Sequence, residues 1–340
     1  MRRTLLPVVL LVSALVGFAA APAAADEPGL GLSHSTSVGV HNAYEKSQYP
    51  YLADALDTGA GLLELDVWTD GLFKKWRVSH DYPFVGSNNN CAAGGLRAGA
   101  RDQDLAVCLD NLRAWHAANP RHPLLIVKVE MKNGFNDRGG VGPDELDRLI
   151  AQRLTGVVYR PADLLRGAFT DLDAAARADS WPTRAELTGR IILEIVPGTF
   201  ERANPLDRLW TDVEYARYLH SLQASGRIGE ATIFPAVLGA AAGDPRTRYA
   251  DSGLRAWFVL FDGNATSYVG GGVDPAWYDG NHYLLVMTDA QAVAPPIDAR
   301  TPSPEEARAR VTQLAAAHAS VVTSDWTPAT GALPLVVPRG

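Results

Sequence analysis

Long hydrophobic runs are missing from this sequence beyond its first 25 residues. No later segment approaches the roughly 18 uninterrupted apolar residues of a membrane-spanning helix, so we expect no transmembrane span. Positive charge is also scarce, since 31 Lys and Arg against 38 Asp and Glu give a net charge of −7. This balance argues against nucleic-acid binding and against simple Coulomb attraction to anionic lipid. A phosphate-bearing substrate would need a local positive centre, such as a bound metal ion.

The N-terminus carries the one long apolar segment. Two arginines precede an apolar run from Leu5 to about Ala20, and small residues follow as far as Ala25. This order of a charged, an apolar and an Ala-x-Ala segment is typical of a secretory signal peptide. We predict that residues 1–25 are removed and that residues 26–340 form a secreted protein. A membrane anchor is the alternative, but the apolar run is short for a span.

Cysteine is nearly absent: only Cys91 and Cys108 occur. Two thiols seventeen positions apart make a metal site of cysteines alone a poor interpretation. In an exported chain an even pair of cysteines favours a disulfide. We therefore expect a Cys91–Cys108 bridge, which would contribute roughly 3 kcal/mol by restricting the unfolded chain.

Short apolar runs with β-strand composition alternate with longer Ala- and Leu-rich stretches, and no repeat or heptad pattern occurs. We expect strands at Ser37–Val40, Leu62–Trp68, Trp76–Ser79, Leu124–Val129, Ile191–Val196, Trp257–Phe261, Tyr283–Thr288 and Ser320–Thr323. Helices are expected at Leu105–Ala118, Asp144–Leu154, Val213–Ser225 and Pro304–Ala317. This alternation indicates an α/β fold with parallel strands, and it fits a single (β/α)8 TIM-like barrel with some distortion.

Two intervals fit the barrel badly. The stretch from Asp66 to His80 is too short for a helix, and Ile233–Leu238 competes with Trp257–Phe261 for the sixth strand. A doubly wound open sheet is the alternative architecture. The segments Gly86–Arg101 and Gly263–Gly272 are expected to be long loops.

Polar side chains of the kind used in catalysis end several of the predicted strands. Glu64 and Asp66 are two residues apart and share one strand face, where two desolvated carboxylates need a cation between them. The alternative for this pair is a strand with one solvated face. Glu130, His41 and His80 also end apolar runs, and in a barrel such ends converge on one rim, where active sites lie.

The types of these residues indicate a divalent metal ion together with histidines that transfer protons. Oxygen donors suit Ca²⁺ or Mg²⁺, and here they are Asn42, Glu64, Asp66 and Glu130. Such a metal leaves His41 and His80 free to move protons, as phosphodiester cleavage requires. Lys132 shares the strand face of Glu130 and is predicted to bind substrate, unless it is simply solvated. Further side chains near later strand ends could line the pocket: Arg160, Glu194, Asp262, Asp289 and Asp325.

Four segments together resemble a known family. Val38–Tyr44 resembles the His-Asn-x-Tyr segment of calcium-dependent phosphoinositide-specific phospholipases C. Leu56–Gly71 is similar to their Gly-x-x-x-x-Glu-Leu-Asp-x-Trp-x-Gly region, with one extra residue before the last glycine. Val78–His80 matches the strand of their second histidine, and Pro123–Glu130 the strand of a further calcium-binding Glu. These motifs cover roughly residues 37–132, and none could be aligned in the second half of the chain.

The resemblance implies a TIM-like barrel in a secreted bacterial enzyme, with Ca²⁺ held by Asn42, Glu64, Asp66 and Glu130. The implied substrate is phosphatidylinositol, met at a membrane surface by a monomeric protein. Attack of the inositol 2-hydroxyl would release diacylglycerol and a cyclic or open inositol phosphate. His80 would be the general acid for the leaving group. His41 would either deprotonate the hydroxyl or stabilise the phosphorane, and in the second case an acidic calcium ligand would be the base.

Two other functions remain open at this point. A glycerophosphodiester phosphodiesterase or sphingomyelinase D-like enzyme shares the barrel, usually with Mg²⁺, but its first histidine is typically followed by Arg-Gly, whereas Asn42 follows here. Metal-independent bacterial phospholipases C place an arginine at the metal position, and Glu64 and Asp66 argue against that variant. A function of another class is a non-catalytic secreted barrel that binds a sugar or a lipid head group.

Overall fold

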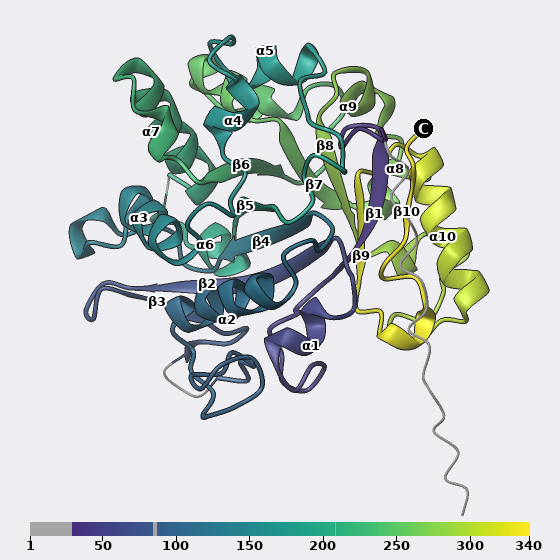
Figure 1. Ribbon diagram of the computed structural model, residues 1–340. Helices are drawn as coiled ribbons and strands as arrows, with labels where there is room; N and C mark the ends of the chain where they lie inside the picture. Colours follow the sequence, from purple (N-terminus) through teal and green to yellow (C-terminus); the bar gives the residue numbers. More distant parts are fainter. Residues whose placement is uncertain (1–28, 84–86, 208) are drawn as a thin grey trace, which may run out of the picture.

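A closed barrel of eight parallel strands forms the centre of the protein (Figure 1). The computed structural model describes residues 29–83, 87–207 and 209–340, so the predicted signal peptide lies outside the described residues. The sheet closes because β1 pairs in parallel with both β2 and β9. The barrel strands are β1 (Ser35–Val40), β2 (Leu62–Asp70), β4 (Leu125–Met131), β5 (Ile191–Pro197), β6 (Ile233–Leu238), β7 (Leu260–Asn264), β8 (Leu284–Thr288) and β9 (Val321–Ser324).

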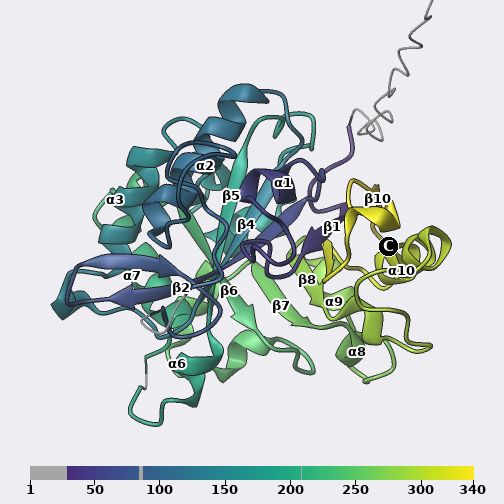
Figure 2. The ribbon, with the colours of Figure 1, turned by 90° about the horizontal axis from the view of Figure 1, so that it is seen from below.

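Helices surround the barrel on its outside (Figures 1 and 2). The four predicted helices are confirmed to within two residues at each end, and Ser303 with Glu306 forms the capping box that starts α10. Within the described ranges, no helix has the length and apolar character that a bilayer crossing requires. The α-helices are α1 (Leu52–Leu56), α2 (Leu105–Ala118), α3 (Pro143–Arg153), α4 (Pro161–Leu165), α5 (Leu172–Arg177), α6 (Thr199–Ala203), α7 (Thr211–Ala224), α8 (Ala265–Tyr268), α9 (Ala276–Gly280) and α10 (Pro304–Ala316).

The (β/α)8 prediction is confirmed. The open-sheet alternative is wrong, because β1 pairs with both β9 and β2 and so closes the eight parallel strands into a ring. The two candidates for the sixth strand are both strands, β6 and β7, although β7 begins at Leu260. The segment Gly263–Gly272 is not a simple loop, since β7 extends to Asn264 and α8 follows at once.

The predicted strand Trp76–Ser79 is not a barrel strand. It is β3 (Lys75–Val78), which runs antiparallel to the end of β2 and pairs Val78 with Val67. β2 continues past the barrel rim and β3 returns, so the two form a projecting arm (Figure 2). This resolves the interval between Asp66 and His80, because a hairpin needs no crossover helix. A second antiparallel strand, β10 (Val336–Pro338), pairs with β1.

Strand register aligns the polar side chains in layers inside the barrel. Glu64 of β2 pairs with Lys128 of β4, which pairs with Glu194 of β5. Asp66 pairs with Glu130 one layer nearer the carboxyl rim. Since strand side chains alternate with a period of two, this set faces the interior while the intervening leucines and valines pack against the helices.

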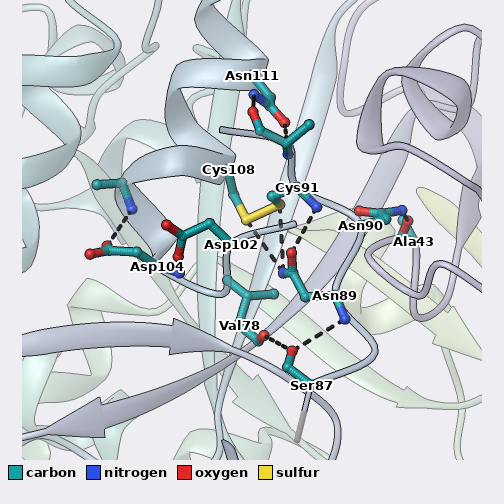
Figure 3. Close-up of a disulfide and its surroundings, with 12 residues drawn as sticks. Ala43, Val78, Ser87, Asn89, Asn90, Cys91, Asp102, Asp104, Cys108 and Asn111 are labelled. Carbon is teal, nitrogen blue, oxygen red and sulfur yellow. Dashed lines mark hydrogen bonds between the residues drawn. A yellow bond between two sulfur atoms is a disulfide. The ribbon is translucent and has the colours of Figure 1, made fainter. Parts of the chain in front are cut away.

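The disulfide is present between Cys91 and Cys108 and joins the loop after β3 to α2 (Figure 3). Asn89 donates through its amide to both sulfur atoms at 3.6 Å. Asn90 donates 2.9 Å to the carbonyl of Ala43, and Ser87 donates 3.2 Å to the carbonyl of Val78. The bridged loop therefore supports the two segments that carry His41 and His80.

Replacing both cysteines by alanine should lower the free energy of unfolding by roughly 3 kcal/mol, because the unfolded chain gains loop entropy. The thermal midpoint of the Cys91→Ala/Cys108→Ala variant measures this loss. Wild-type protein treated with a reductant is the matched control and should melt near the variant. A midpoint unchanged in both samples would contradict a stabilising bridge.

Candidate active site

Three carboxylates meet at the carboxyl rim of β2 and β4. Glu64 and Asp66 are buried, Glu130 is partly buried, and one oxygen of each lies within 4.8 Å of the others. Burial, together with repulsion from Glu64 and Glu130, raises the pKa of Asp66 to about 7. The raised pKa means that the surroundings do not fully stabilise the negative charge of the cluster. This agrees with the expectation that Glu64 and Asp66, two residues apart on one strand face, need a cation between them.

Lys132 neutralises part of this charge. Its ammonium lies 2.9 Å from Oδ2 of Asp66 and 3.0 Å from Oε1 of Glu130. The other oxygen of Asp66, Oδ1, is buried and has no hydrogen-bond partner among the described residues. A buried carboxylate oxygen without a donor fits a cation site of oxygen ligands, so the donor set matches a hard divalent metal.

His41 follows β1 and lies beside this cluster. Its Nδ1 is 2.8 Å from Oδ1 of Asp325, and its Nε2 is 3.3 Å from Oε2 of Glu64. Burial opposes a charge on the ring, but the hydrogen bond to Asp325 and the charge of Glu64 raise the pKa of His41 to about 9. Asn42 holds the turn: its left-handed backbone (φ 53°) suits asparagine, and its N–H donates 3.2 Å to Glu64.

The amide of Asn42 is fixed by a neighbour in the same motif. The hydroxyl of Tyr44, a buried residue, donates 2.9 Å to the amide oxygen Oδ1 of Asn42. This contact explains the His-Asn-x-Tyr pattern physically, because the tyrosine orients the oxygen that the sequence assigns to the metal.

His80 reaches the rim by a route that the sequence did not predict. It follows β3, which returns antiparallel, so it does not end a barrel strand. The backbone N–H of Ser79 donates 3.1 Å to the carbonyl of Asp66, and this bond fixes the level of His80 at the rim. Half of the His80 side chain is exposed, and its Nδ1 lies 3.1 Å from Oδ1 of Asp81.

Two adjoining cavities open at this rim and share His41, Glu130 and Thr199. The first has a volume of about 300 Å³ and is lined mainly by polar groups, including Asp289, Gln291 and Asp325. The second, of about 500 Å³, brings together most of the predicted site and has an aromatic edge: His41, Asn42, Asp66, His80, Glu130, Lys132, Trp68, Tyr82 and Phe200. Glu64 lines the first cavity.

Of the residues proposed to line the pocket from later strand ends, some line the first cavity and others lie elsewhere. Asp262, Asp289 and Asp325 line the first cavity, whereas Glu194 is fully buried and does not line it. Arg160 is wrong as a pocket residue, because it precedes α4 and donates 2.8 Å to the carbonyl of Gly229. Sequence reasoning missed further lining residues that follow barrel strands, namely Thr199, Arg202 and Gln291.

Lys128 is the most informative residue that sequence reasoning missed. It is buried in the barrel, with its ammonium 3.0 Å from Oε1 of Glu64 and 2.7 Å from Oδ2 of Asp262. Burial opposes its charge, but these carboxylates raise the pKa of Lys128. A lysine on the inward face of an apolar strand, at the parity of Glu130, was the available signal.

Glu194 predicts a measurable pH dependence of stability. Neither carboxylate oxygen has a hydrogen-bond partner among the described residues, and burial, with repulsion from Asp262, raises the pKa of Glu194 to about 8. The folded state thus binds this proton more tightly than the unfolded chain. The resulting stability is present below about pH 4.5 and is lost as pH rises through about 8.

The Glu194→Gln variant should lose this pH-dependent part of the stability, because glutamine stays neutral. Its free energy of unfolding should fall less than that of the wild type from acid to pH 8, by on the order of 4 kcal/mol. Denaturant titrations at several pH values measure the difference. The exposed Glu305→Gln change is the control and should keep the wild-type slope, while identical slopes for all three proteins would contradict the assignment.

A closed β/α barrel with an acidic cluster and two histidines at its rim defines a TIM-barrel phosphodiesterase of the phospholipase C type. The protein is similar to a Ca²⁺-dependent phosphatidylinositol-specific phospholipase C from Streptomyces antibioticus, with 56% identity, a TM-score of 0.88, and coverage of 91% of this chain and 99% of that chain. The chain belongs to the family of calcium-dependent phosphatidylinositol-specific phospholipases C.

A more distant structure shares the fold. It is a calcium-dependent phosphoinositol-specific phospholipase C from a Pseudomonas species, with 19% identity, a TM-score of 0.69, and coverage of 94% of this chain and 100% of that chain. The scan against family models and the search of curated proteins gave no match.

Proposed function

We propose that this protein is a calcium-dependent phospholipase C that cleaves phosphatidylinositol into diacylglycerol and a cyclic or open inositol phosphate. The observation that carries the proposal is the division of the rim into two cavities of different character. His41 and Glu130 border both cavities, but His80 lines only the second one, with the aromatic edge. One substrate with a polar ring and an apolar tail would fit across them.

We assign the metal to Asn42, Glu64, Asp66 and Glu130. The unpartnered Oδ1 of Asp66 and the grouping of the three carboxylates support this assignment. Bound there, Ca²⁺ would neutralise charge on the phosphoryl oxygens and acidify a coordinated hydroxyl. Lys132 remains our proposed substrate contact, although its ammonium is held by Asp66 and Glu130 and would have to leave them to meet a phosphate.

The first cavity suits the inositol ring. Its carboxylates would accept hydrogen bonds from ring hydroxyls, and the amide of Gln291 would donate and accept them. Asp289 and Asp325 would repel additional ring phosphates. Arg202 is an exposed cation in the lining, while Lys128 is buried against its carboxylate partners. This charge pattern favours phosphatidylinositol over its phosphorylated forms.

The two histidines divide the proton transfers. His41 lines the first cavity, so its imidazole is placed to act on the attacking 2-hydroxyl of inositol. Asp325 holds this imidazole through Nδ1 of His41. His80 lies in the second cavity, on the side of the diacylglycerol, and would protonate the leaving alkoxide. Glu64 contacts Nε2 of His41 and is the alternative group that accepts the hydroxyl proton.

Exposed hydrophobic side chains support action at a membrane surface. Among the described residues, the large exposed ones all lie in segments that follow the carboxyl ends of β2, β3 and β5, on the side of the active site: Leu72, Phe73, Tyr82, Phe200 and Leu206. Leu72 and Leu206 are 82% and 89% exposed. A rim of this kind can enter the lipid interface without help from a positive surface. We further propose that the protein is exported by residues 1–25 and acts as a monomer.

Replacing Leu72, Phe73 and Leu206 by serine should weaken binding to phosphatidylinositol vesicles by at least about tenfold, because apolar area no longer leaves water. Co-sedimentation with vesicles measures the loss. The control variant Leu72→Ile/Phe73→Leu/Leu206→Ile keeps apolar surface and should bind like the wild type. Equal binding by the serine variant would contradict membrane contact at this rim.

The experiment that tests the function is ³¹P NMR of products from a panel of phospholipids, with and without calcium. Release of inositol phosphates from phosphatidylinositol alone supports the proposal. Products from glycerophosphodiesters or sphingomyelin with Mg²⁺ would favour the phosphodiesterase alternative. Calcium binding without any product would favour a non-catalytic head-group-binding barrel.

A further inference from the structure

A second group of metal-ligating side chains lies at the amino end of the barrel. His34 directly precedes β1, His282 lies two residues before β8, and Asp179 follows α5. His34 precedes β1 and His41 follows it, so the two sites are separated by roughly 20 Å along this strand. The cluster is therefore distinct from the active site.

Two imidazole nitrogens flank one carboxylate in this cluster. Nε2 of His34 lies 2.8 Å from Oδ2 of Asp179, and Nδ1 of His282 lies 3.5 Å from Oδ1. One ligand atom of each residue is within 4.8 Å of the other two. Its three members come from distant parts of the chain, so only the fold brings them together.

One of these nitrogens is left unsatisfied. Nδ1 of His282 is shielded from solvent and has no hydrogen-bond partner among the described residues, although the carboxylate of Asp179 is close. Leaving a buried polar atom unpaired costs roughly 1–3 kcal/mol. A cation between the two imidazoles and the carboxylate would satisfy it.

The surroundings hold the ligands in place before any ion binds. Ser33 donates 2.8 Å to Oδ1 of Asp179, which fixes the carboxylate. Nη1 of the buried Arg339 donates 2.9 Å to the carbonyl of Ser33 and 2.9 Å to that of Tyr283, joining the segments before β1 and β8. Gly31 lies against the ring of His34, where a Cβ would come within 2.9 Å of Cδ2.

We propose that His34, Asp179 and His282 form a zinc site that stabilises the amino end of the barrel. Two imidazoles and one carboxylate are a zinc donor set, whereas calcium prefers oxygen ligands alone. Zinc–ligand distances of about 2.0–2.2 Å place tetrahedral donor atoms roughly 3.3 Å apart. The donor atoms here lie within 4.8 Å of one another, so the most distant pair would close by at most roughly 1.5 Å. The partial exposure of all three side chains allows this movement and leaves the fourth position to water.

Bound zinc would connect the chain before β1 to the chain before β8. At the amino face of a barrel, such a link acts on stability and not on turnover. An ion that binds only the folded protein raises its melting temperature in proportion to the logarithm of the ion concentration.

The test is isothermal titration of ZnCl₂ into the protein kept saturated with calcium, so that the rim site is filled. We expect one zinc ion per chain and a rise in melting temperature. The His282→Asn variant should lose more than about tenfold in zinc affinity. Asparagine is chosen because the backbone of His282 has φ 57°, a left-handed conformation that asparagine tolerates.

The matched control is His116→Asn, because His116 lies 3.1 Å from the imidazole of His122 and belongs to no metal-ligating group among the described residues. It should bind zinc like the wild type. Cobalt(II) gives a second readout, since a tetrahedral site produces strong visible absorption that His282→Asn should abolish. Absence of zinc binding, equal affinity in wild type and His282→Asn, or loss of zinc binding in His41→Asn instead would overturn the proposal.

Discussion

Turnover of phosphatidylinositol by a His80→Ala variant is expected to fall by roughly 10²- to 10⁴-fold, because diacylglycerol is a poor leaving group without a proton donor. A substrate with an acidic leaving group, such as a nitrophenyl inositol phosphate, should lose far less. Half of the His80 side chain is exposed, so the variant should keep its melting temperature. The measurement is kcat/KM on both substrates.

The controls for this experiment separate chemistry from local structure. Asp81 lies 3.1 Å from His80 and is exposed, so Asp81→Asn should change the rate less than His80→Ala does. A loss of the same size on both leaving groups would contradict a general-acid role for His80. His41→Ala should reduce turnover on both substrates, since the attacking hydroxyl is common to them.

Removing calcium with excess EGTA should abolish turnover, and Mg²⁺ should fail to restore it. Glu64 and Asp66 lie on β2 and Glu130 lies on β4, and their oxygens come within 4.8 Å of one another. Calcium accepts a flexible set of oxygen ligands, whereas magnesium demands a near-ideal octahedron. Activity assays across buffered calcium concentrations measure the effect. Full activity in excess EGTA would eliminate the metal assignment, and with it the role of the carboxylates.

Direct calcium binding tests the ligands without relying on turnover. Asp66→Asn removes a charge from the oxygen pair that includes the unpartnered Oδ1, and calorimetry should show at least a tenfold loss of calcium affinity. Asp274→Asn is the control, because Asp274 is exposed and its oxygen only accepts a hydrogen bond from the N–H of Ala276. Unchanged affinity in Asp66→Asn would place the ion elsewhere.

Much of the architecture could be read from local patterns. Strands and helices followed from apolar periodicity, and the closure into a barrel followed from their number and alternation. The failures were local as well: Trp76–Ser79 has a strand composition, yet composition does not say whether a strand is parallel or antiparallel. Ile233–Leu238 and Trp257–Phe261 are both candidates for the sixth strand because each segment is an apolar run of similar length. The structure uses both regions, as β6 and β7.

The sequence predicts those parts of the site whose residues are neighbours in the chain. Glu64 and Asp66 had to share a face because of the strand period, and His41-Asn42 had to be adjacent. The contacts of Asp325 with His41, of Lys128 with Glu64 and of Asp262 with Lys128 were not predicted, since each joins residues far apart in the chain. Their side chains are common residue types, and only proximity gives them a function.

The sequence by itself determined which side chains are available: carboxylate and amide oxygens, two imidazoles, a cysteine pair, and a chain of alternating strands and helices. These properties belong to residue types and to spacings of a few positions, which local geometry fixes. The tertiary structure decided which groups meet. It returns His80 to the rim by an antiparallel strand, places Lys132 between Asp66 and Glu130, and brings His34 to Asp179 at the other end of the barrel. These contacts join residues that are far apart in the chain, and spacings of a few positions do not fix which of those residues meet.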